Sequence, residues 1–144
     1  MYNFLLVLHS LLRWLILLLL VLNINRLFGA KGPAKTGNSI LLLIFAHTTL
    51  LIGLYQYFFG NFGIALFKQG AEVMKNSALR FWAVEHITGM VVGIALITIG
   101  HISLKKTGKA KKTAILYLVA LILILAVIPW PFREAIARPW VHGF

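Results

Sequence analysis

Six ionisable side chains interrupt the long apolar runs of this chain. They are His9, Arg13, His47, Glu85, His86 and His101. Placing such a group in the interior of a bilayer costs several kcal/mol, so each is a candidate for a functional role. Neutral imidazole is a common ligand of haem iron and of other transition metals. The set therefore indicates a bound cofactor or metal.

The depths of the histidines can be compared by counting from the basic residues that end their runs. At ~1.5 Å per helical residue, His9 and His86 lie roughly 25 and 28 Å from those ends. His47 lies nearer the middle, at the depth of Arg13, and His101 lies alone near the basic end. Two histidines on facing helices can form a six-coordinate haem b site. We therefore predict His9 and His86 as axial ligands, His47 as the reserve ligand, and His101 as an interfacial residue.

Charged and aromatic residues accompany the two predicted ligands. Arg13 follows His9 by four residues, so both project from one helix face. Arg13 could form an ion pair with Glu85, or it could hold an anionic group such as a haem propionate. Arg80 is a second candidate for the propionates, and Trp82 would form a wall of the cofactor pocket.

Two glycines, Gly89 and Gly93, lie in the third apolar run, residues 81–104, on the same helix face as His86. A Gly-x-x-x-Gly pair usually forms a close helix-packing surface. Absent side chains could also leave room for a flat macrocycle, and both roles can hold together.

The sequence also limits which other kinds of metal site are possible. A zinc site built from His9, His47 and His86, with Glu85 as base, is a geometric alternative. The paired-histidine helix motif typical of zinc hydrolases does not occur in the sequence. Cysteine is also absent, which excludes disulfides, thiolate metal sites and covalent haem attachment through Cys-x-x-Cys-His.

The apolar runs determine the fold class. Of the 144 residues, 60% are hydrophobic and 12% are charged, whereas soluble domains have about 25% charged residues. Such a composition excludes a soluble domain and a disordered chain. Each run can cross a ~30 Å hydrocarbon core, and only helices satisfy the backbone there. We predict one all-α domain over residues 1–144, an antiparallel bundle of four transmembrane helices at about 4–25, 39–59, 80–104 and 112–130, with residues 131–144 as an interfacial tail.

The charge of the chain is strongly asymmetric. The net charge is +11. The first and third loops hold eight basic residues and no acid, namely Arg26, Lys31, Lys35, Lys105, Lys106, Lys109, Lys111 and Lys112. The opposite side holds five basic residues and all three glutamates. The positive-inside rule then places both termini outside and the first and third loops in the cytoplasm. The basic residues are expected to meet membrane lipids and not nucleic acid.

Four segments resemble a family of short bacterial four-helix membrane proteins labelled cytochrome b-like: His9-Ser10-Leu11-Leu12-Arg13-Trp14, His47 with Gly53-Leu54-Tyr55-Gln56-Tyr57, Arg80-Phe81-Trp82 with Glu85-His86, and Pro129-Trp130-Pro131-Phe132-Arg133. The resemblance spans nearly the whole chain. It implies a haem b site within a four-helix bundle, with His9, His47 and His86 at the matching positions.

A looser resemblance links the chain to four-helix membrane protoporphyrinogen oxidases, through His9, Trp14 and the sequence Arg26-Leu27-Phe28. The chain departs from that family because Trp14 follows His9 too closely, Asn25 replaces a proline, and the third span lacks a buried lysine. The sequence thus predicts a haem b-binding electron-transfer protein that works with a quinone, a periplasmic redox partner or a second copy. A porphyrin-handling oxidase, or a cofactor-free structural subunit of a larger membrane complex, are the alternatives.

Overall fold

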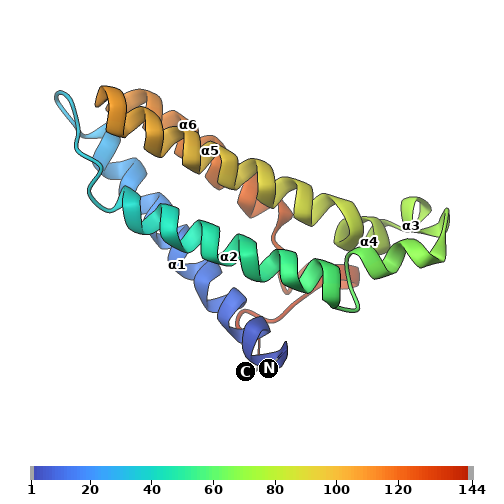
Figure 1. Ribbon diagram of the computed structural model, residues 1–144. Coiled ribbons are helices and arrows are strands. Elements are labelled where there is room, and N and C mark those ends of the chain that lie inside the picture. The colour runs from blue at the N-terminus through green and yellow to red at the C-terminus, as the bar shows by residue number, and fades with distance from the viewer. Residues whose placement is uncertain (1, 143–144) are drawn as a thin grey trace.

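The computed structural model describes residues 2–142, which form helices and no strands (Figure 1). Four helices are long and apolar enough to cross a membrane, and they contain α1 (Tyr2–Phe28), α2 (Ser39–Phe59), α5 (His86–Thr107) and α6 (Ala110–Val127). The predicted all-α class and the four predicted helices of membrane-spanning length are confirmed, and the ends differ by a few residues.

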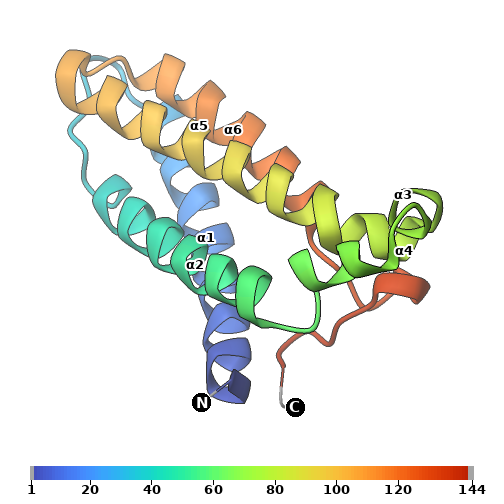
Figure 2. The same cartoon turned by 45° about the vertical axis from the view of Figure 1, so that its right-hand side comes forward.

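Short helical segments extend the bundle at one end. Between α2 and α5 the chain forms η1 (Ile64–Gln69), α3 (Glu72–Lys75), α4 (Ser77–Arg80) and the π-helix η2 (Phe81–Glu85). The last two continue into α5, so the third span runs from Ser77 to Thr107. After α6 the tail contains one turn, η3 (Glu134–Ile136), and returns toward the start of α1 (Figures 1 and 2).

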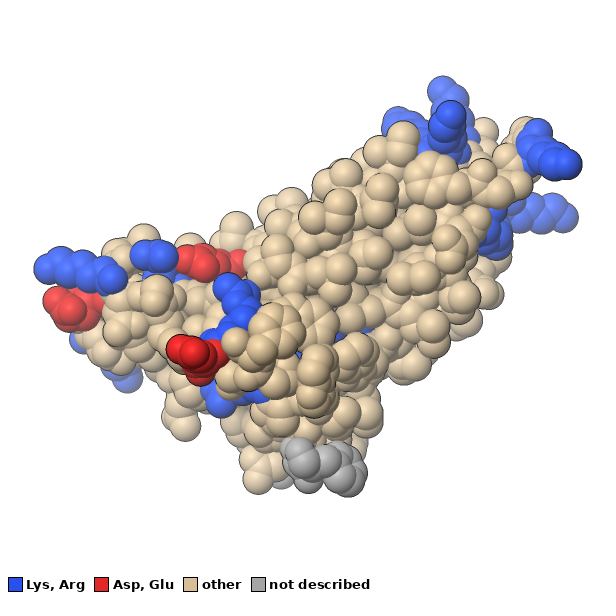
Figure 3. Space-filling model, turned by 180° about the vertical axis from the view of Figure 1, so that it is seen from behind, with Lys and Arg blue, Asp and Glu red and all other residues tan. Residues whose placement is uncertain are grey.

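The α1–α2 and α5–α6 loops lie together at the opposite end (Figures 1 and 2). The Ala34 backbone N–H donates to the Gly108 carbonyl at 3.0 Å, which joins the two loops. The Arg26 guanidinium donates to the Lys35 and Thr36 carbonyls at 2.9 and 3.0 Å. The basic side chains of these two loops therefore gather at one end of the molecule. A broad uncharged band separates them from the other end, where basic and acidic side chains are mixed (Figure 3).

The glycines of α5 are a packing surface against α6. A Cβ on Gly89 would lie 2.5 Å from a methyl carbon of Val127, and one on Gly93 would lie 2.8 Å from Ile124. A Cβ on Gly100 would lie 2.6 Å from the ring of Tyr117. Such distances allow no added atom, so α6 fills the space beside these glycines. The idea that Gly89 and Gly93 leave room for a macrocycle is wrong.

A buried polar cluster fixes the loop end of the bundle. The Ser39 hydroxyl lies 2.8 Å from His101 Nδ1 and 2.5 Å from the Tyr117 hydroxyl. The Thr113 hydroxyl donates to the Gly100 carbonyl at 3.2 Å. His101, expected at the interface, is instead 7% exposed. Burial is tolerated because Ser39, the first residue of α2, supplies its hydrogen-bond partner.

Candidate functional site

A cavity of about 250 Å³ lies at the end of the bundle away from the basic loops. Its walls come from α1, α2, the η2–α5 segment, the end of α6 and the tail. The first half of α1 diverges from α5, and the tail returns toward the start of α1 (Figures 1 and 2). Most of the lining side chains are apolar, and the polar ones include His9, Arg13, Gln56, His86 and Arg138.

His86 lies at the first position of α5, immediately after the π-helix. Its Nδ1 is 2.8 Å from the Val127 carbonyl, at the end of α6. The last carbonyls of a helix have no partner within the helix, so Val127 is free to accept this bond. A carbonyl can only accept, and Nδ1 must therefore carry the proton. In the neutral ring the other nitrogen, Nε2, then keeps its lone pair.

His9 projects from α1 toward α2, where Gly53 makes room for its ring. A Cβ on Gly53 would lie 3.2 Å from His9 Cε1. His9 Nδ1 is buried and has no hydrogen-bond partner among the described residues. His9 and His86 thus line the same cavity from two different helices, as the comparison of their depths predicts.

Buried polar atoms without partners concentrate at this cavity. Among the described residues there are three such side-chain atoms, His9 Nδ1, Arg13 Nε and Gln56 Nε2. All three belong to residues that line the cavity. Buried polar groups in proteins are nearly always hydrogen-bonded, and each exception requires an explanation. These three atoms therefore leave polar groups available to a ligand or to water in the cavity.

Arg13 binds the tail and not Glu85. Its Nη2 donates to the Trp140 carbonyl and to the Ser10 hydroxyl, the latter at 3.3 Å. Trp14 Nε1 donates to the same Trp140 carbonyl at 2.8 Å. The ion pair between Arg13 and Glu85, one of the two alternatives for Arg13, is therefore wrong.

Glu85 has another partner, because Arg80 Nε donates to its Oε1 at 2.7 Å. Arg80 also donates from Nη1 to the Met74 carbonyl at 3.1 Å. Neither side chain lines the cavity. The structure therefore separates Glu85 and Arg80 from the predicted site.

Trp82 does line the cavity, as expected. Its ring centroid lies 5.8 Å from that of His86. The π-helix that carries Trp82 ends where the His86 backbone N–H donates to the Phe81 carbonyl, five residues back. Tyr57 fastens this segment to α2, because its hydroxyl donates to the Ala83 carbonyl at 3.0 Å. Such π-turns are frequent at functional sites.

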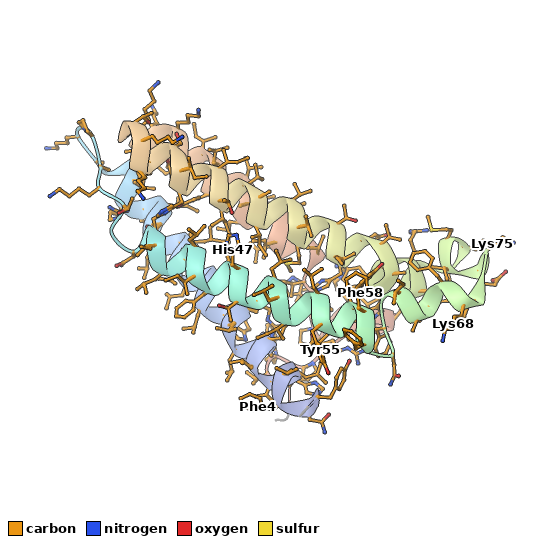
Figure 4. All side chains as sticks on the ribbon, in the orientation of Figure 1. Phe4, His47, Tyr55, Phe58, Lys68 and Lys75 are labelled. Atoms are coloured by element: carbon orange, nitrogen blue, oxygen red, sulfur yellow. The ribbon has the colours of Figure 1, made fainter. Side chains whose placement is uncertain are left out.

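The structure does not bring His47 to the cavity. His47 is exposed midway along α2, and its Nδ1 lies 2.9 Å from the Leu43 carbonyl of its own helix (Figure 4). Within residues 2–142, no group of three or more His, Asp, Glu or Cys side chains could hold a metal ion. The zinc arrangement of three histidines is therefore wrong.

Sequence reasoning missed the contribution of the tail. Arg138 and His142 line the cavity, and the His142 backbone N–H donates to the Ser10 hydroxyl at 3.3 Å. The Arg138 guanidinium lies over the rings of Phe62 and Trp82, at 4.7 and 4.8 Å from their centroids. The sequence Arg138-Pro139-Trp140 indicates an interfacial segment, but it carries no signal that the segment folds back over α1.

The site therefore combines two histidines from facing helices, two arginines and a mostly apolar wall. Such a set can ligate a metal centre from two sides and neutralise an anionic substituent. The chain matches no family model, no curated protein and no solved structure in comparisons with known proteins.

Proposed function

We propose that the protein binds haem b in this cavity and transfers electrons within the membrane, with His9 and His86 as axial ligands. The observation that carries the proposal is the bond from His86 Nδ1 to the Val127 carbonyl at 2.8 Å. Ligating histidines almost always donate their other ring N–H to a carbonyl or a carboxylate, which fixes the tautomer and the ring orientation. His86 is held in that state by the protein alone.

His9 supports the same proposal from the other side of the cavity. Its Nδ1 is buried without a hydrogen bond of good geometry among the described residues, so this atom is open to a bound group. The ring rests against Gly53 of α2, which restricts its orientation. Bound haem b would supply one-electron redox chemistry.

The polarity and charge of the cavity also suit this ligand class. Most of its lining side chains are apolar. No acidic side chain among the described residues lines it, whereas Arg13 and Arg138 do. An anionic, largely apolar molecule such as a porphyrin would complement both features.

The place of the site in the molecule limits its partners. The charge asymmetry favours an orientation with the cavity on the periplasmic side of a bacterial cytoplasmic membrane. One haem near that side cannot carry electrons across a ~30 Å core alone. The protein would then exchange electrons with a quinone, a periplasmic redox protein or a second copy of itself.

An absorption spectrum of the detergent-purified protein tests the proposal, recorded oxidised and then reduced with dithionite. We expect a Soret band that shifts on reduction, with sharp α and β bands. His86→Ala and His9→Ala should each lose the low-spin spectrum. His47→Ala is the matched control, because His47 lies on α2 outside the cavity and should keep it. A flat spectrum from haem-sufficient cells, or full haem retention in His86→Ala, would refute the proposal.

A further inference from the structure

Arg138 is a cation without a counter-ion in the part of the chain that the structure describes. Its side chain lines the cavity and is partly buried. Its guanidinium stacks on Phe62 and Trp82, and stacking leaves the in-plane N–H donors free to bind another group. Within residues 2–142, Arg138 forms no salt bridge and its side chain donates no hydrogen bond.

Arg13 contributes a second unused donor. Its Nη2 is occupied by Ser10 and the Trp140 carbonyl, but its Nε is buried and has no partner among the described residues. The contact with Trp140 also joins Arg13 to the tail that carries Arg138. The two guanidinium groups thus reach one cavity from α1 and from the tail.

The acidic residues of the protein do not neutralise these two arginines. Glu85 pairs with Arg80 and Glu72 with Lys75, and Glu134 is exposed and lies outside the cavity lining. Two cations in a mostly apolar cavity are costly unless an anion joins them. Guanidinium groups favour carboxylates, which they bind through two parallel hydrogen bonds.

We propose that Arg13 and Arg138 recognise the carboxylate groups of a ring-containing amphipathic ligand, so that the tail is part of the binding site. The inference rests on the proposed function and deepens it, because it assigns the propionate end of the ligand to these two residues. It keeps Arg13, which the sequence suggests for that role, and replaces Arg80, the second candidate, with Arg138. Trp14 and Ser10 act as positioning residues, since they hold the tail backbone at Trp140 and His142.

Metal-free protoporphyrin IX and its dimethyl ester test this inference without any iron ligation. Both would be titrated, by porphyrin fluorescence, into protein free of bound porphyrin in phosphatidylcholine nanodiscs. We expect the diacid to bind at least about tenfold more tightly than the diester, because charge-assisted bonds to carboxylates are the stronger ones. Arg138→Gln should reduce the preference to about twofold or less, and Arg138→Lys should keep part of it because the charge remains.

Arg80→Gln is the matched control and should keep the full preference for the diacid. Equal affinity of the unmodified protein for diacid and diester would overturn the inference, even if the low-spin haem spectrum supported the proposed function. A clear preference for the diacid in a protein that shows no low-spin haem would support the inference and refute the function. Failure of both porphyrins to bind would refute both.

A second lipid composition tests whether the two arginines recognise the carboxylates of the ligand or the phosphates of anionic lipids. The titrations are repeated in nanodiscs that contain phosphatidylglycerol. A preference that persists there supports a site for the carboxylates of the ligand. Loss of the preference would mean that the two arginines bind lipid headgroups, which would overturn the inference.

Discussion

His9 and His86 owe their positions to small features of their neighbours. Gly53 gives the His9 ring its space on α2, and the open end of α6 gives His86 its acceptor. Neither feature involves a charged group. The histidines at the two ends of the bundle also differ in kind: His101 has a protein hydroxyl as partner, whereas His9 Nδ1 has none among the described residues. That contrast separates a structural histidine from a candidate ligand.

Replacing Gly53 with alanine should weaken ligand binding without unfolding the protein. The new Cβ would lie 3.2 Å from His9 Cε1, so the ring must turn by a small angle. An off-rotamer side chain costs about 0.5–1.5 kcal/mol, which corresponds to roughly a twofold to tenfold loss of haem affinity. A haem titration of the purified variant measures this loss.

Gly100→Ala is the control for that experiment. Its Cβ would lie 2.6 Å from the Tyr117 ring, far from the cavity, and overpacking costs about 1–3 kcal/mol. The control should unfold at a lower temperature and bind haem with unchanged affinity. Equal haem affinity of Gly53→Ala and the unmodified protein would count against the placement of His9.

Ser39→Ala should destabilise the loop end of the bundle. The change leaves His101 Nδ1 and the Tyr117 hydroxyl buried without the partner that both share. We expect the free energy of unfolding to fall by about 1–3 kcal/mol, measured by denaturant unfolding in detergent. Tyr117→Phe, which leaves Ser39 bonded to His101, should lose less, about 0.5–1.5 kcal/mol. A Ser39→Ala protein as stable as the unmodified one would show that the cluster contributes nothing.

The four spanning helices were predictable from sequence, but their rotations were not. Hydropathy and length identify a span because the bilayer core has a fixed thickness. The direction in which a residue faces depends on packing against the other helices. His47 illustrates the difference, since its depth is compatible with ligation but its side chain points outward. The π-helix and the returning tail were also unpredictable, because both follow from tertiary contacts of Tyr57, Arg13 and Trp14.

Deletion of Val84 tests the role of the π-helix. A turn closed between residues five apart holds one residue more than an α-turn, so the deletion should restore a regular helix. The segment before the deletion would then change its rotation and its distance along the axis relative to α5. Trp82 would shift from its place on the cavity wall, whereas His86 would keep its bond to Val127.

We expect the Val84 deletion to retain a low-spin haem spectrum and to bind haem roughly threefold to tenfold more weakly, as for the loss of one aromatic contact. Deletion of Gly32, which lies in open space in the α1–α2 loop, should leave the affinity unchanged. Unaltered affinity after the Val84 deletion would exclude a role for the π-helix in binding.

The charged side chains lie at the two ends of the molecule, and the two ends differ in the kinds of charge they carry. One end is purely basic, and the other mixes arginine, lysine and all three glutamates (Figure 3). Between them lies the band of exposed apolar side chains. Such an arrangement suits a bilayer, and the basic end is expected on the cytoplasmic side.

Cysteine labelling can test this orientation cleanly, because the sequence contains no cysteine. Single substitutions Lys31→Cys and Lys109→Cys place thiols in the basic loops, and Lys68→Cys and Lys75→Cys place them at the other end. A membrane-impermeant maleimide applied to intact spheroplasts should label only the second pair. Labelling of the first pair alone would reverse the orientation.

The bond between α1 and the tail also sets an order of events during synthesis. Arg13 and the Trp140 carbonyl that it binds are 127 residues apart. At ~5–20 residues per second, a ribosome needs roughly 6 to 25 s to make the chain between them. In the later part of that interval α1 and α2 have been made and the tail has not. One side of the cavity therefore stays open until the last residues of the chain are added, and the tail completes it.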